Sequence, residues 1–133
     1  MTAAASITIK KNDGTTDVVW SLLAASGGDK SPAVWRSGTA TGTAGQQPTL
    51  TIQSRDNGDK TARRTDMTFV FPSVYTDAAS GLTKVRSKAI VNVSAVLPLD
   101  MTSADINEQG AQFAHLLNAA LVVGTLQSGY APT

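Results

Sequence analysis

The sequence predicts an α+β fold in which antiparallel strands are followed by two helices. Before Pro98, apolar and polar residues alternate in short runs separated by turn residues, which is typical of half-buried strands. After Pro98 the period changes, and Ile106, Phe113 and Leu117 recur at helical spacing. Strands grouped before helices favour an α+β arrangement over alternating α/β units. The chain is expected to form a single domain, residues 1–133.

The first predicted element is a hairpin at about residues 1–23. Residues 6–10 alternate, Asn12-Asp13-Gly14 supplies a turn that tolerates positive φ, and residues 15–22 return as a second strand. The first five residues carry no basic region and no long apolar run, so no signal peptide is expected.

The sheet is predicted over residues 33–97. Its main strands are expected at 33–37, 48–55, 62–71 and 85–97. Residues 38–46 read as a loop, residues 56–59 as a turn, and residues 73–84 as a short strand with a long loop. Pro72 is expected to end or border its strand because proline cannot donate to the ladder. In 62–71, Arg64, Asp66 and Thr68 alternate with apolar residues, which places them on one face.

Two helices are predicted at about residues 102–127. Thr102 and Asp105 form a capping pair, Asn118 interrupts the helix, and Gly129 ends it. The apolar residues cover a wider arc than one sheet face can bury, so a homodimer with exchanged helices is favoured.

Composition speaks against most enzymes. The chain has no cysteine and one histidine, which leaves no disulfide, no thiolate nucleophile and little material for a catalytic triad or a metal cage. No catalytic residue, metal site or cofactor is therefore predicted. His115 is expected to be a packed or surface residue, and Trp20 and Trp35 are expected in the core or an interface. Asp66 and Asp100 could act as paired acids only if the fold brought them together.

The net charge of +1 hides an asymmetry along the chain. Residues 1–88 carry 11 basic and 7 acidic groups, whereas residues 89–133 carry three acidic groups and no basic one. A basic face would suit a polyanion, although ordinary solubilising charge explains the same numbers.

The order of these pieces resembles the coat proteins of the single-stranded RNA bacteriophages, the levivirus family. The likeness covers almost the whole chain. It rests on the hairpin at 7–18, Trp35 in a short strand, the strand 49–55 that ends in a basic residue, the strand 63–72 closed by proline, Arg86-Ser87 at the start of the last long strand, and Ser128-Gly129-Tyr130 near the end.

The resemblance implies an N-terminal β-hairpin, a five-stranded antiparallel sheet and two C-terminal helices in an interlocked homodimer. Such dimers assemble into an icosahedral shell around single-stranded genomic RNA. This implies localisation in the virion, assembly in the bacterial host cytoplasm and no membrane partner. In the family, the inner sheet face also binds an RNA stem-loop, which represses translation of the replicase and marks the genome for packaging.

The resemblance also implies three sets of site residues. The RNA-binding set is Thr49, Thr51, Gln53, Arg55, Arg64, Asp66, Thr68, Arg86, Lys88 and Asn92, with Ile90 on the same face. The symmetry-axis loop contains Asp77, Ser80, Gly81 and Lys84. The core or dimer set is Phe69, Phe71, Ile106, Phe113, Leu117 and Leu121.

The sequence departs from the family on the RNA face. Well-known members have a hydroxyl at the position of Asp66, a lysine at Thr68 and a polar or charged residue at Ile90. A carboxylate beside phosphate is unfavourable unless Arg64 or Lys88 pairs with it, so general RNA packaging is favoured over a specific operator site. The alternative function is a small β-rich self-assembling or binding module without nucleic acid.

Overall fold

The computed structural model describes residues 2–38, 40 and 42–133 of the chain. Residue 1 of the predicted hairpin segment and residues 39 and 41 of the predicted loop at 38–46 lie outside the described residues. The chain divides into two compact units, residues 1–96 and 97–133. The first unit contains the sheet and the second contains the helices.

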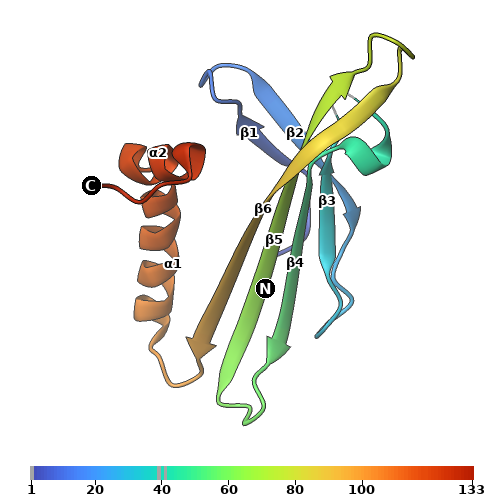
Figure 1. Ribbon diagram of the computed structural model, residues 1–133. Coiled ribbons are helices and arrows are strands. Elements are labelled where there is room, and N and C mark those ends of the chain that lie inside the picture. Colours follow the sequence, from blue (N-terminus) through green and yellow to red (C-terminus); the bar gives the residue numbers. More distant parts are fainter. Residues whose placement is uncertain (1, 39, 41) are drawn as a thin grey trace. The chain divides into compact units, whose positions relative to one another are not determined.

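The strands form one six-stranded sheet in sequence order (Figure 1). Their bounds are β1 Ile7–Lys10, β2 Asp17–Ala24, β3 Ala33–Ser37, β4 Thr49–Asp56, β5 Ala62–Thr76 and β6 Thr83–Pro98. A short 3₁₀ helix, Ala44–Gln46, precedes β4. The first four strand pairs are antiparallel. The predicted antiparallel sheet is therefore confirmed.

The N-terminal hairpin is part of this sheet, because β2 pairs with β3 as well as with β1. Its turn is closed by a hydrogen bond from Lys11 N to Thr16 O at 2.8 Å. Gly14 has φ +73°, a left-handed conformation that favours glycine. The Asp13 carboxylate accepts hydrogen bonds from the backbone N–H groups of Thr15 and Thr16, both at 2.9 Å. The hairpin predicted from Asn12-Asp13-Gly14 is thus confirmed.

The core of the first unit lies on one face of the sheet. Trp20, Ala33 and Trp35 are buried there, and the partly buried side chains around them are Val18, Leu22, Leu50, Ile52 and Phe69. The rings of Trp20 and Phe69 are 5.7 Å apart, which is within the range of favourable aromatic contact. The Trp35 indole N–H donates to the Ala5 carbonyl at 2.8 Å. Both tryptophans are core residues, as expected.

The region after Pro72 differs from the prediction. Strand β5 continues through Pro72 to Thr76, and β6 begins at Thr83, so the expected long loop at 73–84 is a turn at 77–82. The register between β4 and β5 ends at Thr49↔Val70. Pro72 therefore lies beyond the part of β5 that pairs with β4, where a missing N–H donor is tolerated.

The second unit contains α1 Ser103–Leu117 and α2 Ala120–Ser128. At the start of α1, the Thr102 hydroxyl accepts from Asp105 N at 3.2 Å, which is the predicted cap. The break at Asn118 and the stop at Gly129, which has φ +79°, are also confirmed. No residue of either helix is buried within the described chain.

Candidate nucleic-acid interface

The register of β4 and β5 separates an apolar face of the sheet from a polar one. On the apolar face, Leu50 lies opposite Phe69 and Ile52 lies opposite Met67. The alternate positions form the polar face, and their opposing pairs are Thr51↔Thr68, Gln53↔Asp66 and Arg55↔Arg64. Since side chains alternate along a strand, these residues project from the side of the sheet away from the tryptophan core.

Strand β6 extends the polar face. The Thr68 hydroxyl donates to Asn92 Oδ1 at 3.2 Å, and the Ser94 hydroxyl donates to Asp66 Oδ1 at 2.9 Å. The structure therefore brings together eight residues of the RNA-binding set, which are Thr49, Thr51, Gln53, Arg55, Arg64, Asp66, Thr68 and Asn92. We call these eight residues, with Ser94, the polar cluster. Their assignment to RNA stays a prediction.

The charges of the polar cluster are only partly balanced. Arg55 Nη2 lies 3.4 Å from Asp66 Oδ2. Asp66 is therefore paired with Arg55 on the neighbouring strand, and not with Arg64 or Lys88, the two residues named above as able to offset it. Within the described residues, Arg64 forms no ion pair, and its Nε is buried without a hydrogen-bond partner.

One basic residue of this face was absent from the predicted set. Arg36 lies opposite Thr49 in the β3–β4 register, so its side chain projects from the polar face. The alternation of Ala33, Trp35 and Ser37 with Val34 and Arg36 carries this signal in the sequence. The alternation alone does not say which face of the sheet Arg36 shares, because that depends on the register of β3 with β4.

Arg86 and Lys88 lie nearer the start of β6 than Asn92 and Ser94 do. The Arg86 guanidinium sits 5.1 Å from the centre of the Tyr75 ring, a cation–π distance. Across the described part of the chain, no hydrogen bond or ion pair joins Arg86 or Lys88 to the polar cluster. Their place in an RNA interface remains a prediction from the resemblance and from the alternation of β6.

The turn between β5 and β6 holds three of the four residues predicted for the symmetry-axis loop. Asp77 N donates to Leu82 O at 2.8 Å, and Gly81 has φ +69°. The Asp77 carboxylate contacts Lys84 Nζ at 2.8 Å and accepts from Ser80 Oγ at 3.2 Å. The bond to Lys84 is the main cause that lowers the pKa of Asp77 below its ordinary value. Lys84 itself lies in β6, not in a loop.

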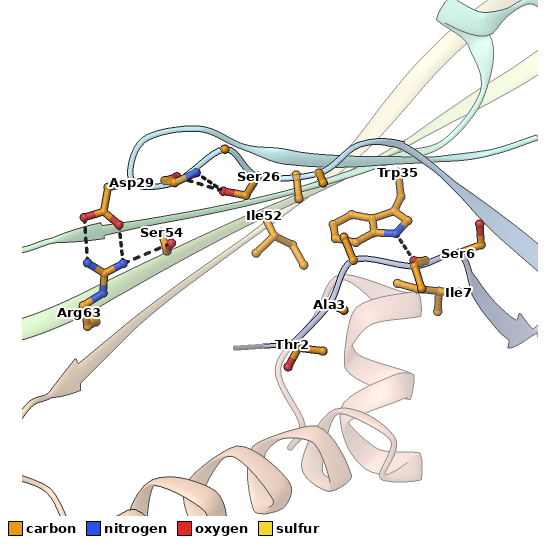
Figure 2. A pocket seen from close by; sticks show the side chains of 16 residues that line it. Thr2, Ala3, Ser6, Ile7, Ser26, Asp29, Trp35, Ile52, Ser54 and Arg63 are labelled. Atoms are coloured by element: carbon orange, nitrogen blue, oxygen red, sulfur yellow. Dashed lines mark hydrogen bonds and ion pairs between the residues drawn. The ribbon is translucent and has the colours of Figure 1, made fainter.

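A pocket of about 960 Å³ lies in the first unit, between residues 2–7, the loop at 25–29 and strands β3 and β4 (Figure 2). Its lining is mostly small or apolar. The two charged side chains in it, Arg63 and Asp29, are paired with each other, and Arg63 Nη1 also contacts Asp56 Oδ1 at 2.6 Å. The hydrogen bond from Arg63 lowers the pKa of Asp29. This pairing joins the loop that contains Asp29 to the adjoining ends of β4 and β5.

The described residues contain no group of three or more His, Cys, Asp or Glu side chains placed to hold a metal ion. In the same part of the chain, no helix has the length and apolar character needed to span a membrane.

Comparison with known proteins gives matches at the level of structure. No family model and no curated protein matches the sequence. The protein chain in a virus-like particle of Beihai levi-like virus 21 superposes on this chain with a TM-score of 0.81 at 16% sequence identity, and the match covers 99% of both chains. The bacteriophage EMS014 coat protein gives 0.78 at 18% identity over 99% of this chain and 100% of that one. The bacteriophage GA capsid protein gives 0.75 at 18% identity over 96% and 95%. The chain therefore has the coat-protein fold of the single-stranded RNA bacteriophages, as the sequence resemblance predicted.

Proposed function

We propose that this chain is a phage coat protein whose homodimers assemble into an icosahedral shell around single-stranded RNA. The observation that carries the proposal is the arginine pair Arg55 and Arg64 on the polar face of a coat-protein fold. The proposal places the assembled protein in the virion and its assembly in the cytoplasm of the bacterial host.

The arginine pair favours a polyanion as the ligand. Like charges at directly opposing positions in an antiparallel sheet destabilise it. Of the two arginines, Asp66 contacts only Arg55, and Arg36 adds a further cation to the face. A phosphate backbone would neutralise both arginines and release its counterions, which gives a salt-dependent affinity. We propose general, phosphate-directed RNA binding as the main role of the face, and binding of a repressor stem-loop as a second role of the same surface.

Strand β6 supports dimer formation. It is the last strand in the sheet order, so one of its edges has no neighbour within the described chain. The strand has 16 residues, and its last ten, 89–98, carry no charge. A long uncharged edge strand is a template for pairing with another chain. A second copy that pairs β6 with β6 would close this edge and make one continuous sheet.

Each unit, taken by itself, exposes large apolar side chains, and this supports the same conclusion. Phe71 in the first unit is 51% exposed, and Leu121 in the second is 65% exposed. Of the other four members of the predicted core or dimer set, Phe113 and Leu117 are also exposed, whereas Ile106 and Phe69 are partly buried. Several large apolar side chains exposed on one short helical unit, such as Phe113, Leu117 and Leu121, favour an interface there. We propose that a second copy covers it.

Electron microscopy of the purified protein tests the shell. Expression in bacteria should give closed, uniform particles that are built from dimers. A stable monomer or a lone dimer across a range of salt and pH would overturn the proposal. Particles or oligomers that contain no nucleic acid would favour the alternative of a β-rich self-assembling module.

A further inference from the structure

We propose that Asp66 makes the polar cluster selective for an unpaired guanine in the bound RNA. This inference rests on the proposed RNA-binding function and adds a base preference to it. Asp66 is the one acidic side chain in the polar cluster. Phosphate contacts position RNA but carry no sequence information. A carboxylate repels phosphate, so a role for Asp66 in RNA binding has to involve the bases and not the RNA backbone.

Asp66 is held in place but keeps acceptor capacity. Oδ1 accepts one hydrogen bond from Ser94 Oγ at 2.9 Å, and Oδ2 lies 3.4 Å from Arg55 Nη2. A carboxylate offers about four lone-pair positions and donates no hydrogen bond when ionised. The side chain is 37% exposed, so a ligand can reach it. Asp66 therefore presents two oriented acceptor atoms to whatever binds the face.

The pattern of two neighbouring acceptors selects among the four bases. Guanine presents two adjacent donors, N1–H and the N2 amino group, on its Watson–Crick edge. Adenine and cytosine place a ring-nitrogen acceptor beside their single amino donor, so one carboxylate oxygen would face a lone pair. Uracil places its single N3–H donor between two carbonyl oxygens. Guanine alone can donate to both oxygens at once, and unpaired bases are recognised on this edge.

The neighbours of Asp66 fit an unpaired base. Gln53 lies directly opposite Asp66 in the register, and Thr68 and Asn92 are joined by a hydrogen bond one alternate position along the face. Arg64 lies two residues before Asp66 on the same strand and the same face. Amide and hydroxyl groups can contact the ribose and the remaining base atoms, and Arg64 can contact the adjoining phosphate.

Competition binding with short single-stranded RNAs tests the inference. Purified protein is titrated with oligouridine strands that differ only in one central base, which is guanine, adenine, cytosine or inosine. Wild-type protein should prefer guanine over adenine by about tenfold, in line with a good bidentate contact. Inosine lacks the N2 amino group and should fall between the two. In D66N the preference should shrink to less than twofold, while overall affinity rises because a negative charge is removed.

The matched control is Asp17→Asn. Asp17 lies on β2, pairs with Lys10 and carries the same charge as Asp66, outside the polar cluster. The D17N protein should keep the guanine preference. A wild-type protein that binds all four strands equally would overturn the inference and leave RNA binding intact, as would a guanine preference that survives in D66N. Absence of any salt-dependent RNA binding would overturn both the inference and the proposed function.

Discussion

Arg55 and Arg64 lie directly opposite each other in the β4–β5 ladder, on the face that also carries Thr51 and Thr68. Asp66 contacts the first of these arginines and not the second. A sheet that places two cations side by side and balances one of them is less stable than it could be. A polyanion bound to this face, as proposed above, would balance both cations.

Removing Arg64 should weaken RNA binding without unfolding the protein. In R64A, the slope of log affinity against log salt should become shallower by about 0.7, as expected when one single-strand phosphate contact is lost. Lys88→Ala should act in the same direction. Titrations at several salt concentrations measure the slope. Lys60→Ala is the matched control, because Lys60 lies in the β4–β5 turn and its loss should leave the slope unchanged. Unchanged RNA binding in both R64A and K88A would remove these residues from the interface.

Phe113→Ala should damage the dimer. Phe113 is 47% exposed in the single chain, and the proposed second copy would bury its ring. Truncation of a buried phenylalanine costs about 3–5 kcal/mol. Denaturant unfolding and light scattering measure stability and oligomeric state. Gln112→Ala, one residue away on α1, should change the free energy of unfolding by no more than about 0.5 kcal/mol. A normal dimer of F113A with wild-type stability would show that α1 uses another face.

A charge on the edge of β6 should block dimer formation. Val91→Lys places a cation in the uncharged part of the strand, 89–98, and edge lysines oppose strand pairing. Size-exclusion chromatography with light scattering should show a shift from dimer toward monomer. Thr8→Lys adds the same charge to β1, the strand at the opposite edge of the sheet. That control should remain dimeric, and a fully dimeric V91K would argue against pairing through β6.

Asp13 should make stability fall in acid. Its hydrogen bonds from Thr16 and Thr15 favour the charged carboxylate and lower its pKa from 3.8 to about 2 in the folded chain. Because the folded pKa is depressed, the stabilisation is complete above about pH 4 and disappears as the pH falls toward 2. Asp13→Asn keeps an acceptor oxygen but cannot titrate. The free energy of unfolding of D13N should therefore fall less than that of the wild type between pH 5 and pH 2.5, and parallel curves would contradict the assignment.

Local sequence patterns were sufficient to predict most elements of the fold. Alternation placed Arg64, Asp66 and Thr68 on one face, and the register with β4 confirms it. Thr102, Asn118 and Gly129 predicted the limits of the helices because caps are set by neighbouring residues. These signals act over a few residues, so they can be read without tertiary contacts.

Features that depend on which strands are neighbours were less predictable. Pro72 was expected to end or border its strand, and in the structure β5 continues through it, beyond the part that pairs with β4. Asp66 pairs with Arg55 on another strand, and Arg36 joins the polar face through the β3–β4 register. In each case the deciding contact joins residues far apart in the sequence, and alternation along one strand cannot identify it.

A cryo-electron microscopy reconstruction of the purified particle tests the proposed function most directly. The predicted result is a closed shell in which the polar face of β4 and β5 lines the interior, with RNA density against Arg55 and Arg64. A shell in which this face points outward, or in which it lines the interior without any RNA density beside the two arginines, would contradict the proposal.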